Sequence, residues 1–117
     1  MEATIKEMIS CLRKQVENDV PESGEFNRVY ERSAYPDDSL CITDFVIRVE
    51  MVPVHLDTTK TKRNLVLDAY KLPCPYKSST IISSGTKQEI LTKLDEEGLA
   101  MYLAEKLKSL SHDLDEF

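Results

Sequence analysis

Residues 83–87, Ser-Ser-Gly-Thr-Lys, have the residue types of a phosphate-binding turn and come directly before a helical pattern. The first N–H groups of a helix are free and partly positive, so an anion can bind there. A P-loop, however, needs its lysine directly after a glycine, and Thr86 separates Gly85 from Lys87. Thr86 and Glu89 have the spacing of a capping box, which predicts an ordinary helix start. The alternative is an anion site formed by Ser83, Ser84, Gly85, Thr86 and Lys87.

A second candidate site is the basic group Lys60, Lys62 and Arg63, which lies in the polar segment 57–64. We expect this segment to form the tip of a β-hairpin. Cations there can contact nucleic-acid phosphates, with nearby tyrosines as stacking faces for bases. Lysines at hairpin tips also serve simply to prevent pairing with another chain. A third use is contact with an acidic protein, including the acidic end of a second copy.

Cys74, between two prolines, is the cysteine most suited to chemistry. A catalytic thiol needs a base to form the thiolate, and the histidines are His55 and His112. No catalytic signature surrounds any of these residues, so a rigid turn bounded by prolines is the favoured interpretation. The three cysteines are irregularly spaced and predict neither a disulfide framework nor a metal site. We expect no catalytic residues and no cofactor.

Charge and length restrict the class of protein. The formal net charge of -6 argues against a surface that neutralises nucleic-acid phosphates throughout. The charge is uneven, because residues 57–85 are basic and both ends of the chain are acidic. The chain has no basic, apolar leader pattern at its start and no apolar run of about 18 residues, which membrane spans need. We therefore expect a soluble cytoplasmic protein that does not enter a membrane.

The elements that must position these residues begin with an amphipathic helix. Apolar residues recur every three or four positions in residues 3–19, and Pro21 should end the helix. Strands are predicted over residues 26–35 and 40–56, the second with strict alternation and one partly wet face that carries Asp44, Arg48 and Glu50. Pro53 indicates a bulge, a bend or an edge position.

Two further strands and a helical region complete the pattern. Residues 65–72 read as a strand and residues 79–83 as a short fourth candidate. From Thr86 to about Leu110 the pattern is helical, and Asp-Glu-Glu-Gly at 95–98 interrupts it. This region is either one helix kinked near its glycine or two helices, the second capped by Asp95.

The predicted fold is α+β: an N-terminal helix, a three- or four-stranded antiparallel meander, and a C-terminal helix or helix pair packed on one sheet face. Residues 1–117 are expected to form a single domain, with 111–117 as an acidic tail that can fray. The favoured function is a non-enzymatic protein-interaction module that forms a homodimer. One alternative is a nucleic-acid accessory protein that uses residues 60–63. The other is a binder of small anionic ligands, or an enzyme, that uses residues 83–87.

Overall fold

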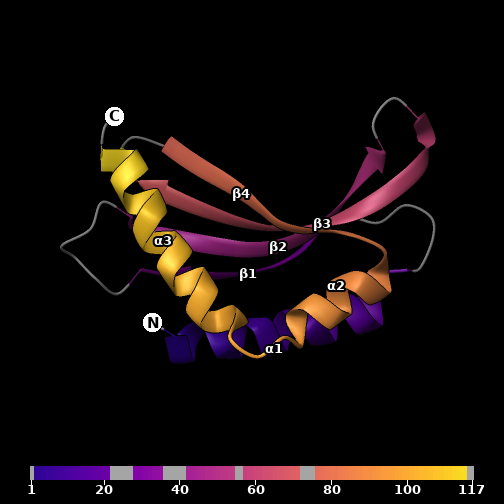
Figure 1. The fold of residues 1–117 in the computed structure, drawn as a ribbon, viewed down its shortest axis with the longest axis horizontal. Helices are drawn as coiled ribbons and strands as arrows, with labels where there is room; N and C mark the ends of the chain where they lie inside the picture. Colours follow the sequence, from indigo (N-terminus) through magenta and orange to yellow (C-terminus); the bar gives the residue numbers. More distant parts are fainter. Residues whose placement is uncertain (1, 22–27, 36–41, 55–56, 72–75, 116–117) are drawn as a thin grey trace.

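The computed structural model describes residues 2–21, 28–35, 42–54, 57–71 and 76–115. Its elements follow the predicted order, and both C-terminal helices are present (Figure 1). In chain order they are α1 (Glu2–Asp19), β1 (Val29–Ala34), β2 (Asp44–Val54), β3 (Asp57–Lys71), β4 (Tyr76–Gly85), α2 (Lys87–Leu94) and α3 (Leu99–Asp115). The α+β fold predicted from the sequence is confirmed. Among the residues described, no helix is both long enough and apolar enough to cross a lipid bilayer.

The sheet is an antiparallel meander in which each strand pairs with the next along the chain, in the order β1-β2-β3-β4. The register shifts between Pro53 and Val54, which confirms the irregularity expected at the proline. A second shift lies opposite Leu65 and Val66, where Ile82 is the extra residue of β4. The placement of a hairpin tip at 57–64 was wrong, because these residues form the first half of β3 and Asp57 already pairs with Val54.

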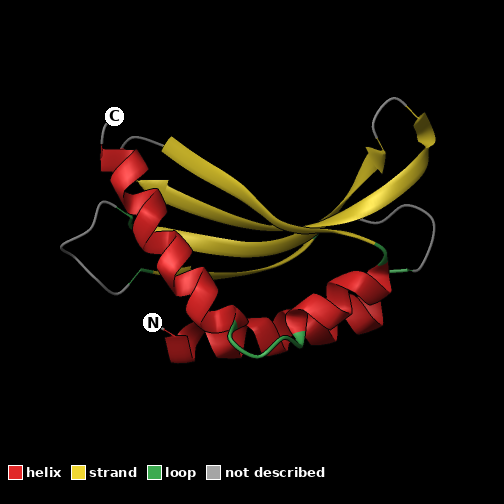
Figure 2. Cartoon of the chain, in the orientation of Figure 1, coloured by secondary structure: helices red, strands yellow, loops and turns green. Residues whose placement is uncertain are grey.

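The helices pack against one face of the sheet (Figure 2), and the hydrophobic core residues come from the helices and from this face. Because side chains alternate along a strand, the core takes every second residue of β2 and β3. These core residues are Phe45, Ile47, Val49, Leu65, Leu67 and Ala69. From α1 the core takes the predicted apolar stripe, Ile5, Met8, Ile9, Leu12 and Val16. From the C-terminal helices it takes residues such as Ile90, Leu94, Leu103 and Leu107.

The segment between α2 and α3 resolves the choice between one helix and two. Gly98 has φ of 87°, a left-handed conformation that breaks the helical path and favours glycine. Asp95 is the C-cap of α2 and does not cap α3, so that part of the prediction was wrong. Helix α3 continues to Asp115. Fraying of residues 111–117 stays a prediction, and residues 116 and 117 lie outside the described part.

Candidate functional site

The face of the sheet opposite the helices is polar, aromatic and uncovered by any described helix. The ladder pairs Tyr30 with Arg48 on β1 and β2, and Arg48 with Val66 on β3. These residues alternate with the core residues and therefore lie on this open face. Val66 is nevertheless only 2% exposed. Long side chains of neighbouring residues must therefore shield it, which makes the open face a packed layer of its own.

A buried ion pair lies at the centre of this layer. The Arg48 Nε donates a hydrogen bond to Asp68 Oδ2 at 2.6 Å, and Ser79 Oγ donates to Asp68 Oδ1 at 2.5 Å. Arg48 also pairs with Glu50. Burial lowers the pKa of Arg48, but its hydrogen bonds to Asp68 and Glu50 raise it by more, so the pKa lies above its ordinary value. The network joins β2, β3 and β4 and fixes the direction of each side chain.

Two arginine–tyrosine pairs flank this centre. The guanidinium carbon of Arg32 lies 5.2 Å from the ring centre of Tyr70, and that of Arg28 lies 5.9 Å from the ring centre of Tyr30. Both distances are within the range of cation–π attraction. Arg32 Nε also donates to Asp44 Oδ2 at 2.7 Å, and this hydrogen bond raises the pKa of Arg32 above its ordinary value.

These side chains surround a depression of about 100 Å³, which we call the Arg-Tyr pocket. It is lined by Arg28, Tyr30, Arg32, Val46, Arg48, Asp68 and Tyr70. All three carboxylates that contact its arginines, Asp44, Glu50 and Asp68, are held in ion pairs. Within the described ranges, Arg28 contacts Tyr30 and pairs with no carboxylate. The three arginines and three carboxylates balance formally, and Arg28 is the one guanidinium at the pocket without a described carboxylate partner.

The basic group predicted from residues 60–63 does not lie on one surface. Lys62 and Arg63 are neighbours on β3 and thus point to opposite faces of the sheet. Lys62 lies on the open face, whereas Arg63 is buried and donates a hydrogen bond to the carbonyl oxygen of Pro21. The side chain of Lys60 lies outside the described part. Nucleic-acid contact by this group stays a prediction.

The turn at 83–87 contains the predicted capping box. Glu89 N donates to Thr86 Oγ1 at 3.2 Å, and Thr86 N donates to Glu89 Oε1 at 3.2 Å. A Cβ placed on Gly85 would lie 2.8 Å from the Glu89 carboxylate, which shows how closely this side chain folds over the turn. A carboxylate thus already lies at the start of α2, where an anion would bind.

The other polar side chains of this turn extend in different directions. Lys87 Nζ donates to the carbonyl oxygen of Glu17 at 3.0 Å, near the end of α1. Ser84 Oγ donates to Asn64 Oδ1 on β3. Ser83 lines a shallow polar depression along α2. Anion binding by residues 83–87 stays a prediction, and an anion would have to compete with Glu89.

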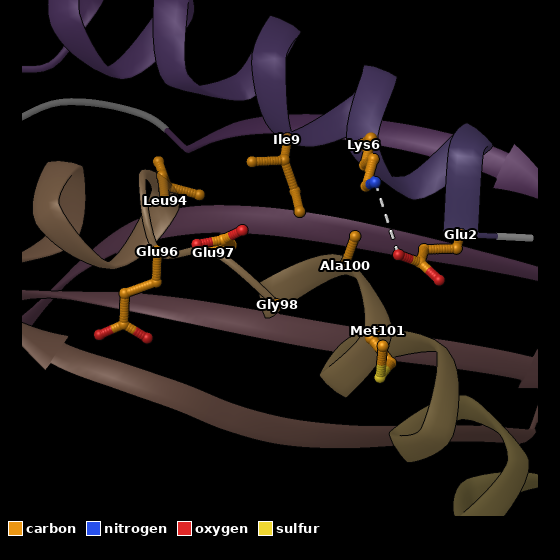
Figure 3. Close-up of a pocket in the computed structure, with 9 residues that line it drawn as sticks. All are labelled: Glu2, Lys6, Ile9, Leu94, Glu96, Glu97, Gly98, Ala100 and Met101. Atoms are coloured by element: carbon orange, nitrogen blue, oxygen red, sulfur yellow. Dashed lines mark ion pairs between the residues drawn. The ribbon is translucent and has the colours of Figure 1, made fainter.

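A larger concavity, about 360 Å³, lies between α1 and the α2–α3 segment (Figure 3). It is lined by Glu2, Lys6, Ile9, Leu94, Glu96, Glu97, Gly98, Ala100 and Met101. Its floor is apolar and its rim mainly acidic, with Glu2 and Lys6 forming an ion pair at 3.5 Å. Glu96 and Glu97 come just before α3. Their negative charges there stabilise the helix, because its N-terminal end carries a partial positive charge. Helix stabilisation therefore accounts for this charge.

A long-range ion pair joins α1 to the C-terminal end of α2. Arg13 on α1 donates to both carboxylate oxygens of Asp95, at 2.5 and 3.1 Å. The hydrogen bond from Arg13 lowers the pKa of Asp95, and the same contact is the main cause that raises the pKa of Arg13. The pair fixes the end of α2 against α1. It is a structural contact that bears on stability.

No described set of three or more histidine, cysteine or acidic side chains is arranged to hold a metal ion. Cys11 is exposed on α1. Cys74 and His55 lie outside the described residues, so their approach to each other stays untested.

The sequence interpretation missed the Arg-Tyr pocket, although residues 28–32 contain a signal for it. Arg28, Tyr30 and Arg32 alternate with a period of two, which places all three on one face of a strand. The sequence could not show that Tyr70, 38 residues further along the chain, would lie beneath Arg32. No known protein family, curated protein or solved structure matches the chain.

Proposed function

We propose that the chain is a non-enzymatic protein-binding domain and that its partner docks on the Arg-Tyr pocket. The observation that carries the proposal is the pair of arginine–tyrosine stacks on a sheet face that no described helix covers. Tyrosine and arginine are the residue types that dominate binding energy at protein interfaces. Arg32 is already held by Asp44 and Arg48 by Asp68, so binding loses little side-chain entropy at these two residues.

The size of the pocket supports a protein partner. Pockets for small molecules usually enclose about 300–1,000 Å³. The Arg-Tyr pocket encloses about 100 Å³, which suits one side chain of a docked protein. Because Arg28 has no described carboxylate partner, we expect that side chain of the partner to be acidic.

The irregular cysteine spacing supports a reducing, cytoplasmic setting for the interaction.

Charge favours a protein over nucleic acid as the partner. The chain carries a formal net charge of -6, so most of its surface repels phosphates. On the open face, the five described cations Arg28, Arg32, Arg48, Lys62 and Lys77 exceed the three carboxylates Asp44, Glu50 and Asp68 by two charges. This small excess supports recognition of one or two carboxylates more than that of a polyanion.

The test is selection of binding peptides from a displayed random library against the full chain, followed by affinity measurements with the selected peptides. Tyr30 is 53% exposed and Tyr102, on α3, is 49% exposed, so Tyr102→Ala is a matched control for Tyr30→Ala. We expect peptides rich in Asp and Glu whose affinity falls about tenfold or more with Tyr30→Ala, the loss typical of an interface anchor. Tyr102→Ala should leave their affinity unchanged.

Two results would contradict the proposal. Selected peptides that bind Tyr30→Ala as well as the original chain would place the binding surface elsewhere. Tight binding of single-stranded oligothymidylate, lost on Tyr30→Ala and falling steeply with salt, would instead establish the nucleic-acid alternative.

A further inference from the structure

The two edges of the sheet are protected to different degrees. An edge strand presents unpaired N–H and C=O groups, and natural proteins shield such edges with charges, prolines, bulges or covering segments. Strand β1 is six residues long and carries Glu31 and Arg32. Gln15 of α1 reaches over it, donating to Glu31 Oε1 at 2.7 Å and to the carbonyl oxygen of Tyr30 at 3.5 Å. The β1 edge is therefore short, charged and partly covered.

Strand β4 has little of this protection. It is ten residues long, contains no proline, and has Lys77 as its one charged residue. In the part of the chain that the structure describes, no strand lies beyond it. Its bulge at Ile82 leaves residues 76–81 as a regular edge. Ile81, at the end of this regular run, is 60% exposed, the most exposed of the large hydrophobic residues described.

We propose that the β4 edge pairs with β4 of a second copy, in an antiparallel arrangement about a two-fold axis. Two identical strands related by such an axis form a closed, self-complementary interface. The pairing would supply partners for the free backbone groups of both strands and would partly bury both Ile81 side chains. The inference is independent of what binds the Arg-Tyr pocket.

The charge pattern of β4 suits a second copy in particular. If the two-fold axis passes through Ser79, near the middle of the regular edge, Lys77 of one copy faces Ile81 of the other. No like charges are then opposite each other, a juxtaposition that would destabilise the pair. An unrelated strand has no such built-in match to this sequence.

The symmetry also determines where the pockets lie. Directly opposed residues of paired strands point to the same face of a sheet. A two-fold axis perpendicular to the sheet therefore keeps both open faces on one side and both helical layers on the other. The resulting eight-stranded sheet would present two Arg-Tyr pockets on one surface, an arrangement suited to a partner with two acidic docking segments.

The test is light scattering of the full chain over a concentration series, with three variants. We expect a mass that approaches twice 13.4 kDa and rises no further. Ile81→Lys should raise the dimer dissociation constant about tenfold or more, because it removes apolar burial and adds two like charges at the interface. The conservative Ile81→Val should remain a dimer. So should Met101→Lys, which adds the same charge on α3 at a residue that is 53% exposed.

A monomer at all concentrations, a mass above that of a dimer, or a dimer that Ile81→Lys leaves intact would each overturn the inference. If Ile81→Lys fails to fold by circular dichroism, hydrogen exchange of the unmodified chain decides instead. Backbone amides of β4 should then exchange about tenfold more slowly at high than at low protein concentration, because pairing shields them. Exchange of β4 that does not depend on concentration would refute the pairing.

Discussion

Replacement of Asp68 by alanine should show that the polar layer of the open face contributes substantially to stability. Asp68 is 1% exposed and Arg48 is 8% exposed, so their ion pair is shielded from water. Removing one partner of a buried pair costs about 3–5 kcal/mol, because the remaining charge stays buried. Here Arg48 keeps Glu50 as a second partner, which reduces the penalty. Ser79 is solvent-exposed, and water can replace its lost acceptor.

We therefore expect Asp68→Ala to lower the free energy of unfolding by about 2–3 kcal/mol. Urea unfolding followed by far-UV circular dichroism measures this loss directly. With a slope of about 1.5 kcal/mol per molar urea, the midpoint should fall by about 1.3–2 M. The matched control is Glu50→Ala, which removes the more exposed partner of Arg48 and should cost at most about 1 kcal/mol.

A double substitution tests the cause of the loss. Arg48→Met combined with Asp68→Leu removes both charges and retains apolar volume, so the double variant should be more stable than Asp68→Ala alone. If Asp68→Ala costs less than about 1 kcal/mol, the pair is better hydrated than its burial indicates. If the double variant is less stable than the single one, packing rather than an uncompensated charge controls this site, and the reasoning fails.

Three further results are expected. Because Arg13 lowers the pKa of folded Asp95, this contact contributes stability above the unfolded pKa of about 4 and loses it as pH falls through the folded pKa. Asp95→Asn should thus be less stable than the original chain at neutral pH, with the difference closing in thermal melts toward pH 2; a constant difference would contradict this linkage. Thr86→Ala should cost about 1 kcal/mol, roughly 4 °C in melting temperature, by removing the cap of α2, while Thr86→Ser should retain most of the cap. Gly98→Ala should cost about 1 kcal/mol in urea unfolding, because alanine is strained at a φ of 87° although nothing lies within 4 Å of the added carbon; an unchanged midpoint would show that the backbone relaxes.

Local patterns in the sequence were sufficient to predict most of the elements. The three- and four-residue steps from Ile5 to Met8, Leu12 and Val16 predict α1. The alternation through Phe45 and Ile47 predicts β2 with its core face. The capping box of Thr86 and Glu89 is a short-range signal and was confirmed. These features depend on residues close together in the chain, which is why they could be read directly.

The candidate site depends on register, which short-range patterns do not fix. Asp68 occurs in an apolar strand pattern, and only the pairing of β3 with β2 and β4 places it beside Arg48 and Ser79. The segment 57–64 was misplaced for a related reason. Its threonines and lysines resemble a polar turn, yet its backbone belongs to β3, so strand formation with β2 prevailed over composition.

The position of α1 has a consequence for the order in which the protein is assembled during synthesis. The strands form contacts with their immediate successors, so the meander can begin to pair as it leaves the ribosome. Helix α1 is made first but packs against α2 and α3, and Lys87 must arrive before it can bond the carbonyl of Glu17. The apolar face of the sheet therefore stays incompletely covered until the last helices emerge. We expect the nascent chain to depend most on chaperone protection in that interval, after the sheet has been made and before α3 is available.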